Sequence, residues 1–490
     1  MDEPDLAELL RDVDALRASV DADGAQIEAR WHGWVEAEDF APSAANLARY
    51  LAFRRRDLRR LQRCLMEAGL SSLGRAESRV TPTLEAVSAL LAAAQGATWR
   101  PVPSEAFHAG ERRIAARADL LLGAPSSHSP IRLLVTLPSE AADNADFVAR
   151  LADLGVEAVR INCAHDDEAV WARMIAHVGR APDPMGRRMR IMMDLAGPKI
   201  RTGESRDDKH LRRVAVGDEL AIAAPGRLHA APPATAAIEC TLTEALRRIE
   251  PGQRILLDDG KLDLTVLRRE EWGVVAKIVG GPREKGYKLK PEKGVNFPDT
   301  EIEVPALTDE DSEALRFVAR HADGVGFSFV QDVEDVRLLQ DALARERPDD
   351  WRRLGLLLKI ETKRAVRNLP DLLVRAAGRQ PTAVMIARGD LAVEIGFARL
   401  AEMQEEILWI CEAAQIPAIW ATQVLESLIK TGLSSRGEMT DAAMAARAEC
   451  VMLNKGPFVF EGIAEIDRLI GRMSEHISKK THQLRPLRSW

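Results

Sequence analysis

Residues 354–395 read LGLLLKIETKRAVRNLPDLLVRAAGRQPTAVMIARGDLAVEI, and this stretch decides the fold. Its two apolar runs, 354–358 and 383–386, are typical of parallel strands that are covered on both faces, and an amphipathic helix fits between them. Each run ends in charged residues: Lys359 and Glu361, then Arg388 and Asp390. The carboxyl ends of such strands form the working face of the sheet, so we expect carboxylates and an ammonium to meet there.

The two carboxylates predict a site for a hard divalent cation. Mg²⁺ prefers one or two protein carboxylates, with substrate oxygens and water completing its octahedron. Glu361 and Asp390 could share such an ion. The alternative is a set of surface ion pairs, because strand ends often turn polar. This stretch alone leaves both interpretations open.

The composition is that of a globular protein that works apart from nucleic acid and membranes. The chain has 490 residues, enough for two or three domains, with 46% hydrophobic and 29% charged residues. A net charge of −7 offers no basic field for nucleic acid or an anionic membrane. The chain opens acidic and has no apolar run long enough to span a bilayer, so we expect it in the cytoplasm. Five cysteines without CxxC spacing suggest neither a disulfide framework nor a zinc site.

From residue 131 onward, buried strands alternate with helices, which predicts a parallel sheet with covering helices. The expected strands are 131–137, 158–163, 191–196, 324–329, 354–360, 383–389, 418–422 and 449–454. Eight such units predict an α/β fold, a closed (β/α)₈ TIM barrel. We assign the barrel to 128–203 and 292–480, with 481–490 as a C-terminal tail.

The barrel pattern is interrupted at 204–291, where the sequence is β-like with the turn signals PGQ, DDG and GGP. We interpret this segment as an inserted β-barrel lid domain, which could exclude water from a reaction at the barrel mouth.

Residues 1–127 predict a helical extension. Leucines at helical spacing indicate one helix over 46–68, with Gly69 as its C-cap. An arginine cluster is interspersed with them: Arg54, Arg55, Arg56, Arg59, Arg60 and Arg63. Such a cluster suggests either a phosphate site or a solvated helix face, and the second interpretation is favoured because charge blocks on helices usually face water. The polar run 123–130 is a predicted linker.

Chemistry-bearing residues gather at the predicted strand ends. Strand two ends in Arg160 and Asn162, strand three in Asp194 followed by Lys199 and Arg201, and strand seven in Thr422. An arginine fork, a pair of carboxylates, a lysine and a hydroxyl are the parts that phosphoryl transfer requires. Their placement after separate strands of one barrel favours a shared site over core packing.

Six ordered motifs resemble the pyruvate kinase family. They are AVRINCAHD (158–166), MDLAGPKIRTG (193–203), KGVNFP (293–298), LLLKIET (356–362), MIARGDLAVEI (385–395) and ATQVLESLIK (421–430). The resemblance covers about 131–475. Residues 1–127 look like the helical extension of a pyruvate-kinase-like subgroup of bacterial and plant proteins.

The resemblance implies a role for each site residue. Glu361 and Asp390 would bind Mg²⁺ or Mn²⁺, and Lys359 would neutralise the phosphoryl group in flight. Backbone N–H groups at Gly389 and Asp390 would receive the substrate carboxylate. The remaining roles are phosphate binding by Arg160, proton delivery near Thr422, and nucleotide-phosphate contacts from Arg201, Lys293 and Asn162.

The activity that the resemblance implies is phosphate transfer between phosphoenolpyruvate and ADP, giving pyruvate and ATP through an Mg-stabilised enolate. The protein would be a glycolytic kinase, and we expect it to be a homo-oligomer. Two alternatives stay open. One is a catalytically weak sensor that binds phosphoenolpyruvate. The other is a Mg-dependent oxo-acid lyase, which needs neither a lid nor nucleotide contacts.

The sequence also departs from the family pattern. Ala164 replaces a serine, Asp166 a glycine and Leu195 a threonine, while 136–140 lacks the family's glycine-proline-alanine turn and 454–457 lacks its serine-glycine-glutamate-threonine run. These changes put the protonation step and the acceptor nucleotide in question. The chain ends soon after the last barrel helix, so we expect no effector domain of the familiar kind and an assembly different from the usual tetramer.

A final expectation concerns the monovalent cation. Asn162 and Asp194 of the family's K⁺ region remain, but Ala164 lacks a hydroxyl ligand and Lys199 stands where potassium-dependent members have glutamate. A lysine ammonium can supply the charge that K⁺ otherwise brings. We therefore expect that K⁺ is not required.

Overall fold

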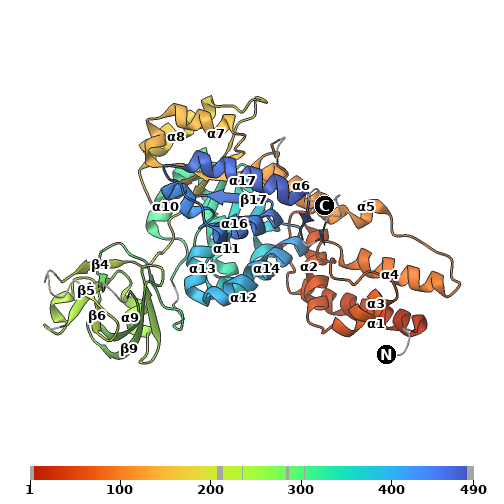
Figure 1. Cartoon of the computed structure of the whole chain (residues 1–490), viewed down its shortest axis with the longest axis horizontal. Coiled ribbons are helices and arrows are strands. Elements are labelled where there is room, and N and C mark those ends of the chain that lie inside the picture. The colour runs from red at the N-terminus through yellow and green to blue at the C-terminus, as the bar shows by residue number, and fades with distance from the viewer. Residues whose placement is uncertain are drawn as a thin grey trace.

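The structure is a computed structural model that describes residues 5–126, 129–206, 213–233, 235–282, 286–302, 304–479 and 481–482. Part of the predicted linker, 127–128, lies outside this range. The chain forms a central barrel with a mainly β insertion on one side and the N-terminal helices on the other, as Figure 1 shows.

Eight parallel strands close the central barrel in the order β1-β17-β16-β15-β14-β13-β3-β2. Their bounds are β1 Arg132–Thr136, β2 Ala158–Asn162, β3 Arg190–Asp194, β13 Gly324–Phe327, β14 Gly355–Ile360, β15 Thr382–Ala387, β16 Ala418–Ala421 and β17 Cys450–Leu453. The predicted TIM barrel is confirmed, with each strand end within two residues of its expected position. Continuous apolar runs identified these strands because both faces of the sheet are buried.

Helices cover the outside of the barrel. They are α7 Ala145–Asp153, α8 Glu168–Arg180, α10 Asp309–His321, α11 Val333–Glu346, α12 Lys363–Ala377, α13 Arg388–Ile395, α14 Phe397–Ala413, α15 Glu426–Thr431, α16 Arg436–Met444 and α17 Val459–Ser474. Capping boxes fix the starts of α10, α11 and α16, where Thr308, Asp332 and Ser435 accept from backbone N–H groups. Of these helices, α11 directly follows a barrel strand, β13, so its cap helps to shape one loop of the working face.

The insertion is a seven-stranded sheet in the order β12-β8-β9-β10-β6-β7-β4, with its own hydrophobic core. Its strands are β4 Thr202–Ser205, β6 Glu219–Ala223, β7 Ala236–Cys240, β8 Arg254–Leu257, β9 Leu262–Glu270, β10 Gly273–Gly280 and β12 Val295–Asn296. The sheet extends beyond the predicted 204–291 because the two segments that connect it to the barrel, 201–203 and 292–296, pair with it and with each other. We call these the hinge segments. An isolated bridge between Arg201 and Gly294 joins them and nearly closes the sheet.

Smaller elements complete these parts. The insertion also contains β5 Arg213–Val214 paired with β11 Tyr287–Lys288, and α9 Thr243–Arg248. At the end of the described chain, β18 Ile477–Ser478 pairs with β19 Thr481–His482. The predicted tail therefore begins with a strand, and 483–490 lie outside the described residues.

The N-terminal extension is helical as expected. Its helices are α1 Leu6–Ala29, α2 Ala41–Arg54, α3 Arg59–Glu67, α4 Val80–Ala94, α5 Ser104–Phe107 and α6 Ala109–Leu122. The prediction of one helix over 46–68 was wrong, because the chain leaves the helix at 55–58. There the Asp57 carboxylate accepts the Arg59 backbone N–H at 3.1 Å, a local bond that competes with helix continuation. Gly69 has φ +73°, which suits the predicted C-terminal position.

The extension packs firmly against the barrel. Leu121 and Leu122 of α6 join the apolar cluster inside the barrel, at the end opposite the strands' carboxyl ends. The Trp31 indole donates to the Asp371 carboxylate on α12 at 2.7 Å, and Ser43 donates to Gln415 at 2.8 Å. These contacts attach the extension to the apolar cluster inside the barrel and to the outer helix α12.

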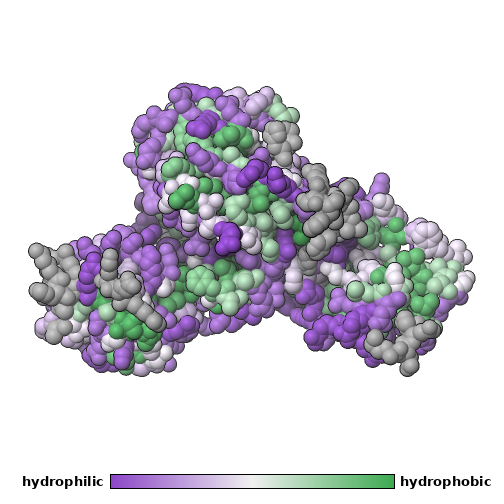
Figure 2. Space-filling model, in the orientation of Figure 1, coloured by the Kyte–Doolittle hydropathy of each residue, from purple (hydrophilic) through white to green (hydrophobic). Residues whose placement is uncertain are grey.

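The visible face of the molecule mixes hydrophilic and hydrophobic residues (Figure 2). Among the described residues, the structure contains no helix that is both long and apolar enough to cross a membrane.

Candidate active site

A cleft of about 250 Å³ opens at the carboxyl ends of the barrel strands. It is lined by Arg160, Asn162, Ala164, His165, Ala196, Lys199, Arg201, Ser328, Phe329, Lys359, Glu361, Met385, Asp390, Thr422, Met452 and Asn454. The structure thus brings together side chains from strands that are far apart in sequence, as the strand-end pattern predicted.

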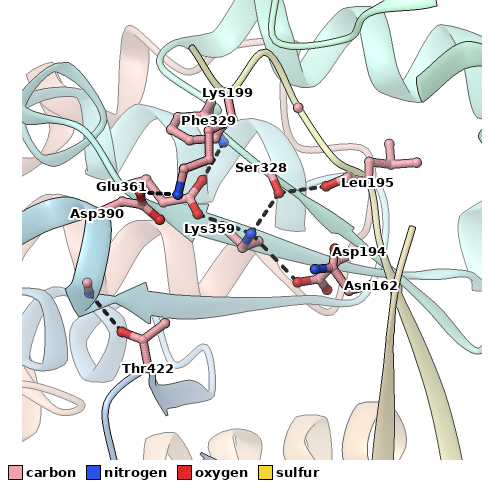
Figure 3. A network of polar contacts seen from close by, with 12 residues as sticks. Asn162, Asp194, Leu195, Lys199, Ser328, Phe329, Lys359, Glu361, Asp390 and Thr422 are labelled. Carbon is pink, nitrogen blue, oxygen red and sulfur yellow. Dashed lines mark hydrogen bonds and ion pairs between the residues drawn. The ribbon is translucent and has the colours of Figure 1, made fainter. Parts of the chain in front are cut away.

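Lys359 on β14 lines this cleft and lies at the centre of a network of polar contacts (Figure 3). Its ammonium is 3.0 Å from Glu361 Oε1 and 3.7 Å from Asp194 Oδ2. It also donates to the Ser328 hydroxyl at 2.7 Å. Burial alone would lower the pKa of Lys359, but the two carboxylates outweigh it and hold the pKa above its usual value. The lysine is therefore a fixed positive charge.

Arg160 on β2 is held by Asp194 of the neighbouring strand β3. Its Nε donates to Asp194 Oδ2 at 2.7 Å, and one terminal nitrogen donates to the Thr136 hydroxyl at 3.3 Å. Burial favours the neutral form of Asp194, but Arg160 and Lys359 prevail and keep its pKa low. A Cβ on Gly326 would come within 2.0 Å of Asp194 Oδ1, so only glycine leaves room for this carboxylate.

Glu361 reaches the cleft from the position directly after β14, and Asp390 from the first turn of α13. Glu361 Oε2 accepts the Phe329 backbone N–H at 2.6 Å. Asp390 Oδ1 lies 2.7 Å from the Lys199 ammonium. Burial raises the pKa of Glu361 against the pull of Lys359, and the nearby Asp390 charge adds to the rise.

The donor set of this cleft is compatible with magnesium. The described residues contain no group of three or more His, Cys, Asp or Glu side chains placed to hold a metal. Mg²⁺ does not need one, because it takes one or two carboxylates and fills its octahedron with substrate oxygens and water. Glu361 and Asp390 on one cleft meet that requirement.

The loop after β16 is strained. Thr422, Gln423 and Leu425 all have left-handed backbones, with φ of 61°, 55° and 48°. Such angles are costly for β-branched and bulky residues and cluster at functional sites. The Thr422 hydroxyl accepts the Gly389 backbone N–H at 2.8 Å, so the two predicted substrate contacts bind each other here.

Arg388 supports this loop from outside the cleft. Its Nε donates to the Ala421 carbonyl at 3.0 Å, it stacks 4.7 Å from the Trp420 ring, and it pairs with Asp441. The Arg388 charge, which the sequence placed at a strand end, therefore stabilises the loop after β16 and does not line the cleft.

Two of the three predicted nucleotide contacts line the cleft, and the third does not. Asn162 and Arg201 line the cleft, whereas Lys293 lies outside its lining with Nζ 3.5 Å from Asp258 of the insertion. Arg201 also donates to the Glu292 carbonyl at 3.2 Å, across the hinge. Arg201 thus contacts both the cleft and the segment that returns from the insertion.

Residues 131–457 match the model of the pyruvate kinase barrel domain. The chain belongs to the pyruvate kinase family. It is 30% identical to the pyruvate kinase of Hypocrea jecorina over 66% of this chain and 59% of that one. It is 31% identical to pyruvate kinase 2 of a Synechocystis strain (70% and 56%) and 28% identical to the Thermotoga maritima pyruvate kinase (70% of each). The chain spans about three fifths of the length of the first of these curated relatives.

A solved structure supports the fold. The crystal structure of a pyruvate kinase from Cryptosporidium parvum superposes with a TM-score of 0.63 at 24% identity, covering 72% of this chain and 70% of that one. At this identity the likeness concerns the fold.

The departures from the pyruvate kinase pattern lie at or beside the cleft. Ala164 and Asn454 line it, where the family has hydroxyl-bearing segments. Asp166 has φ +65°, the left-handed region that favours the family's glycine, and its carboxylate accepts the Ser139 hydroxyl at 2.9 Å. Aspartate tolerates this backbone better than most residues.

Sequence reasoning missed two contributors from the end of β13. The Ser328 hydroxyl bridges Lys359 and the Leu195 carbonyl, donating to the latter at 2.7 Å. Phe329 presents its N–H to Glu361 from a left-handed backbone with φ 56°. Ser328 could have been singled out from the sequence, because it is a polar residue near the end of the predicted strand 324–329 of the same barrel.

Proposed function

We propose that the protein transfers a phosphoryl group between phosphoenolpyruvate and ADP, giving pyruvate and ATP. One observation carries the proposal: the Lys359 ammonium lies between Glu361 and Asp194 in a cleft that also contains Arg160. Phosphoryl transfer depends on positioning and charge neutralisation more than on covalent chemistry by the protein. A buried, fixed ammonium beside an arginine provides both.

The residues then take separate roles. Arg160 would bind the substrate phosphate through the guanidinium edge that Asp194 does not use. Lys359 would neutralise the phosphoryl group in transit. Glu361 and Asp390 would hold Mg²⁺ or Mn²⁺, which when bound supplies further positive charge to substrate oxygens.

Thr422 and Gly389 would act together at the other end of the substrate. The Gly389 N–H, in the first turn of α13, would exchange the Thr422 hydroxyl for the substrate carboxylate. That exchange would free the hydroxyl beside the enolate carbon, where pyruvate receives its proton. Substrate binding would thereby prepare the protonation step.

The insertion would close over the cleft and exclude water. Arg201 lies on both the cleft and the hinge, so it would contact nucleotide phosphates in the open and closed positions. Lys293 would reach them only after leaving Asp258. A lyase acting on an oxo-acid needs no such lid, and the hinged insertion therefore favours the kinase.

The sensor remains a second candidate on one specific observation. Ala164 and Asn454 bring a methyl group and an amide to the cleft at positions where the family has hydroxyl-bearing segments. This change would slow protonation of the enolate while leaving the contacts of Arg160 and Lys359 with phosphoenolpyruvate.

The test is ATP formation by the purified protein from phosphoenolpyruvate, ADP and Mg²⁺, measured by luminescence, with calorimetric binding of phosphoenolpyruvate alongside. ATP formation that Lys359→Met abolishes supports the kinase. Binding without ATP formation supports the sensor. Release of an oxo-acid without ADP would support the lyase and reject both.

A further inference from the structure

A second cavity lies in the N-terminal extension, outside the part of the chain that matches the pyruvate kinase barrel. It measures about 560 Å³ and opens between α2, α3 and the segment 73–77. It is lined by Tyr50, Phe53, Arg54, Arg55, Arg56, Asp57, Leu58, Arg59, Gln62, Leu73, Gly74 and Glu77. We call it the arginine pocket. Small-molecule sites commonly have volumes of roughly 300–1,000 Å³.

The helix break that sequence reasoning missed creates this pocket. One continuous helix would spread its arginines around the helix axis. Instead, the turn at 55–58 brings arginines from the end of α2 and the start of α3 to one opening. The sequence pattern favoured a solvated helix face for these arginines. In the structure, Arg54, Arg55, Arg56 and Arg59 instead line a concave surface. Figure 2 shows hydrophilic residues gathered over α1 and α3.

Two of the pocket's four arginines are already paired. Arg56 lies 2.6 Å from Asp23, and Arg59 lies 2.6 Å from Asp57. Arg55 has no carboxylate partner among the described residues, although it lines the pocket. Four arginines face Asp57 and Glu77, so the lining has a surplus of positive charge.

Arg54 is held in place by two partners that carry no formal charge. Its guanidinium stacks 4.7 Å from the Trp409 ring of α14 and donates to the Tyr50 hydroxyl at 2.7 Å. Burial raises the pKa of Tyr50, so this partner stays neutral. Next to the lining residue Gly74, Arg75 has two shielded guanidinium nitrogens, Nε and one terminal nitrogen, with no hydrogen-bond partner in the described part of the chain.

We propose that the arginine pocket binds a phosphorylated small molecule. Guanidinium groups match phosphate oxygens with paired hydrogen bonds, and groups fixed beforehand lose little freedom on binding. The pocket is bordered by three segments, and the whole chain has a net charge of −7, so a small anion suits it better than a nucleic acid. The site is independent of the catalytic cleft.

The test is calorimetric titration of the full chain with pyrophosphate, using Arg160→Ala as background so that the catalytic cleft contributes less. Arg55→Glu reverses the charge of a pocket residue that makes no ion pair with any described residue, so the variant should fold normally and bind at least about tenfold more weakly. The matched control is Arg63→Glu, an exposed arginine of α3 that does not line the pocket.

Three results would overturn the proposal. The first is no pyrophosphate binding at millimolar concentration in the Arg160→Ala background. The second is an unchanged affinity in Arg55→Glu, and the third is an equal loss in Arg63→Glu, which would indicate general attraction to a basic surface. Arg54→Lys provides a further check, because it keeps the charge but loses the fork, and should also weaken binding.

Discussion

The Lys199 ammonium lies 2.7 Å from Asp390 Oδ1, so an unusual lysine pairs with a carboxylate of the proposed magnesium site. Lys199 also lines the catalytic cleft together with Arg160 and Asn162. Its charge is therefore available where substrate phosphate and metal would meet. An ammonium on a flexible stem can follow that charge as ligands enter.

The first prediction follows from this position. Turnover should not require K⁺, because Lys199 supplies positive charge and Ala164 offers no hydroxyl ligand. Lys199→Glu combined with Ala164→Ser should restore part of the requirement. The measurement is activity in tetramethylammonium buffer free of K⁺ and NH₄⁺, titrated with KCl at constant ionic strength. A large rise for the unmodified protein would end the idea.

The second prediction concerns Lys359. Lys359→Met should lower ATP formation by about a hundredfold or more, since removing one preorganised charge from a water-poor site has effects of that order. The change also leaves Glu361 and Asp194 without their shared ammonium. The melting temperature should therefore fall as well, and rates must be compared well below it. Activity within about tenfold of the unmodified protein would reject the role.

The third prediction concerns the metal. Glu361→Gln and Asp390→Asn should each raise the Mg²⁺ concentration needed for half-maximal activity, because hard cations lose most when a carboxylate becomes neutral. Glu394→Gln is the matched control, since Glu394 lies one turn beyond Asp390 on α13 and accepts from Asn296 at 3.3 Å. Its Mg²⁺ titration should change much less than theirs, because Glu394 does not line the cleft. Identical titrations for all three variants would exclude the site.

The barrel could be predicted from sequence because its signals are local. Strands buried on both faces produce continuous apolar runs, and the charges after them mark the working face. Lys359, Glu361 and Asp390 were found in this way, and the cleft brings them together.

What sequence reasoning missed depends on contacts between distant segments. At the break before α3, the Asp57 carboxylate accepts a local backbone hydrogen bond. In the sequence this aspartate is a weaker signal than the leucine periodicity, which continues across the break. The hinge strands β4 and β12 are short and gain their order from pairing with the rest of the insertion. Likewise, the pairing of Lys293 with Asp258 could not be predicted, because it depends on how the insertion folds.

The last prediction concerns acid stability. Arg160 and Lys359 hold the pKa of buried Asp194 below its usual value, against the effect of burial. A lowered pKa means that the charged carboxylate stabilises the fold above its unfolded-state pKa, about 3.9, and that this contribution is lost as pH falls through the lower folded-state value. Burial raises the pKa of Glu361, so its contribution has the opposite sign and declines as pH rises past about 4.3.

Two variants separate these effects. Asp194→Asn should be less stable than the unmodified protein at neutral pH, by about 3–5 kcal/mol for a broken buried pair, and the difference should shrink below pH 4. Glu361→Gln lacks the opposing group, so its stability relative to the unmodified protein should rise between pH 4 and neutrality. The measurement is urea unfolding of all three proteins across this range. A difference between Asp194→Asn and the unmodified protein that stays constant with pH would show that the carboxylate's charge does not stabilise the fold.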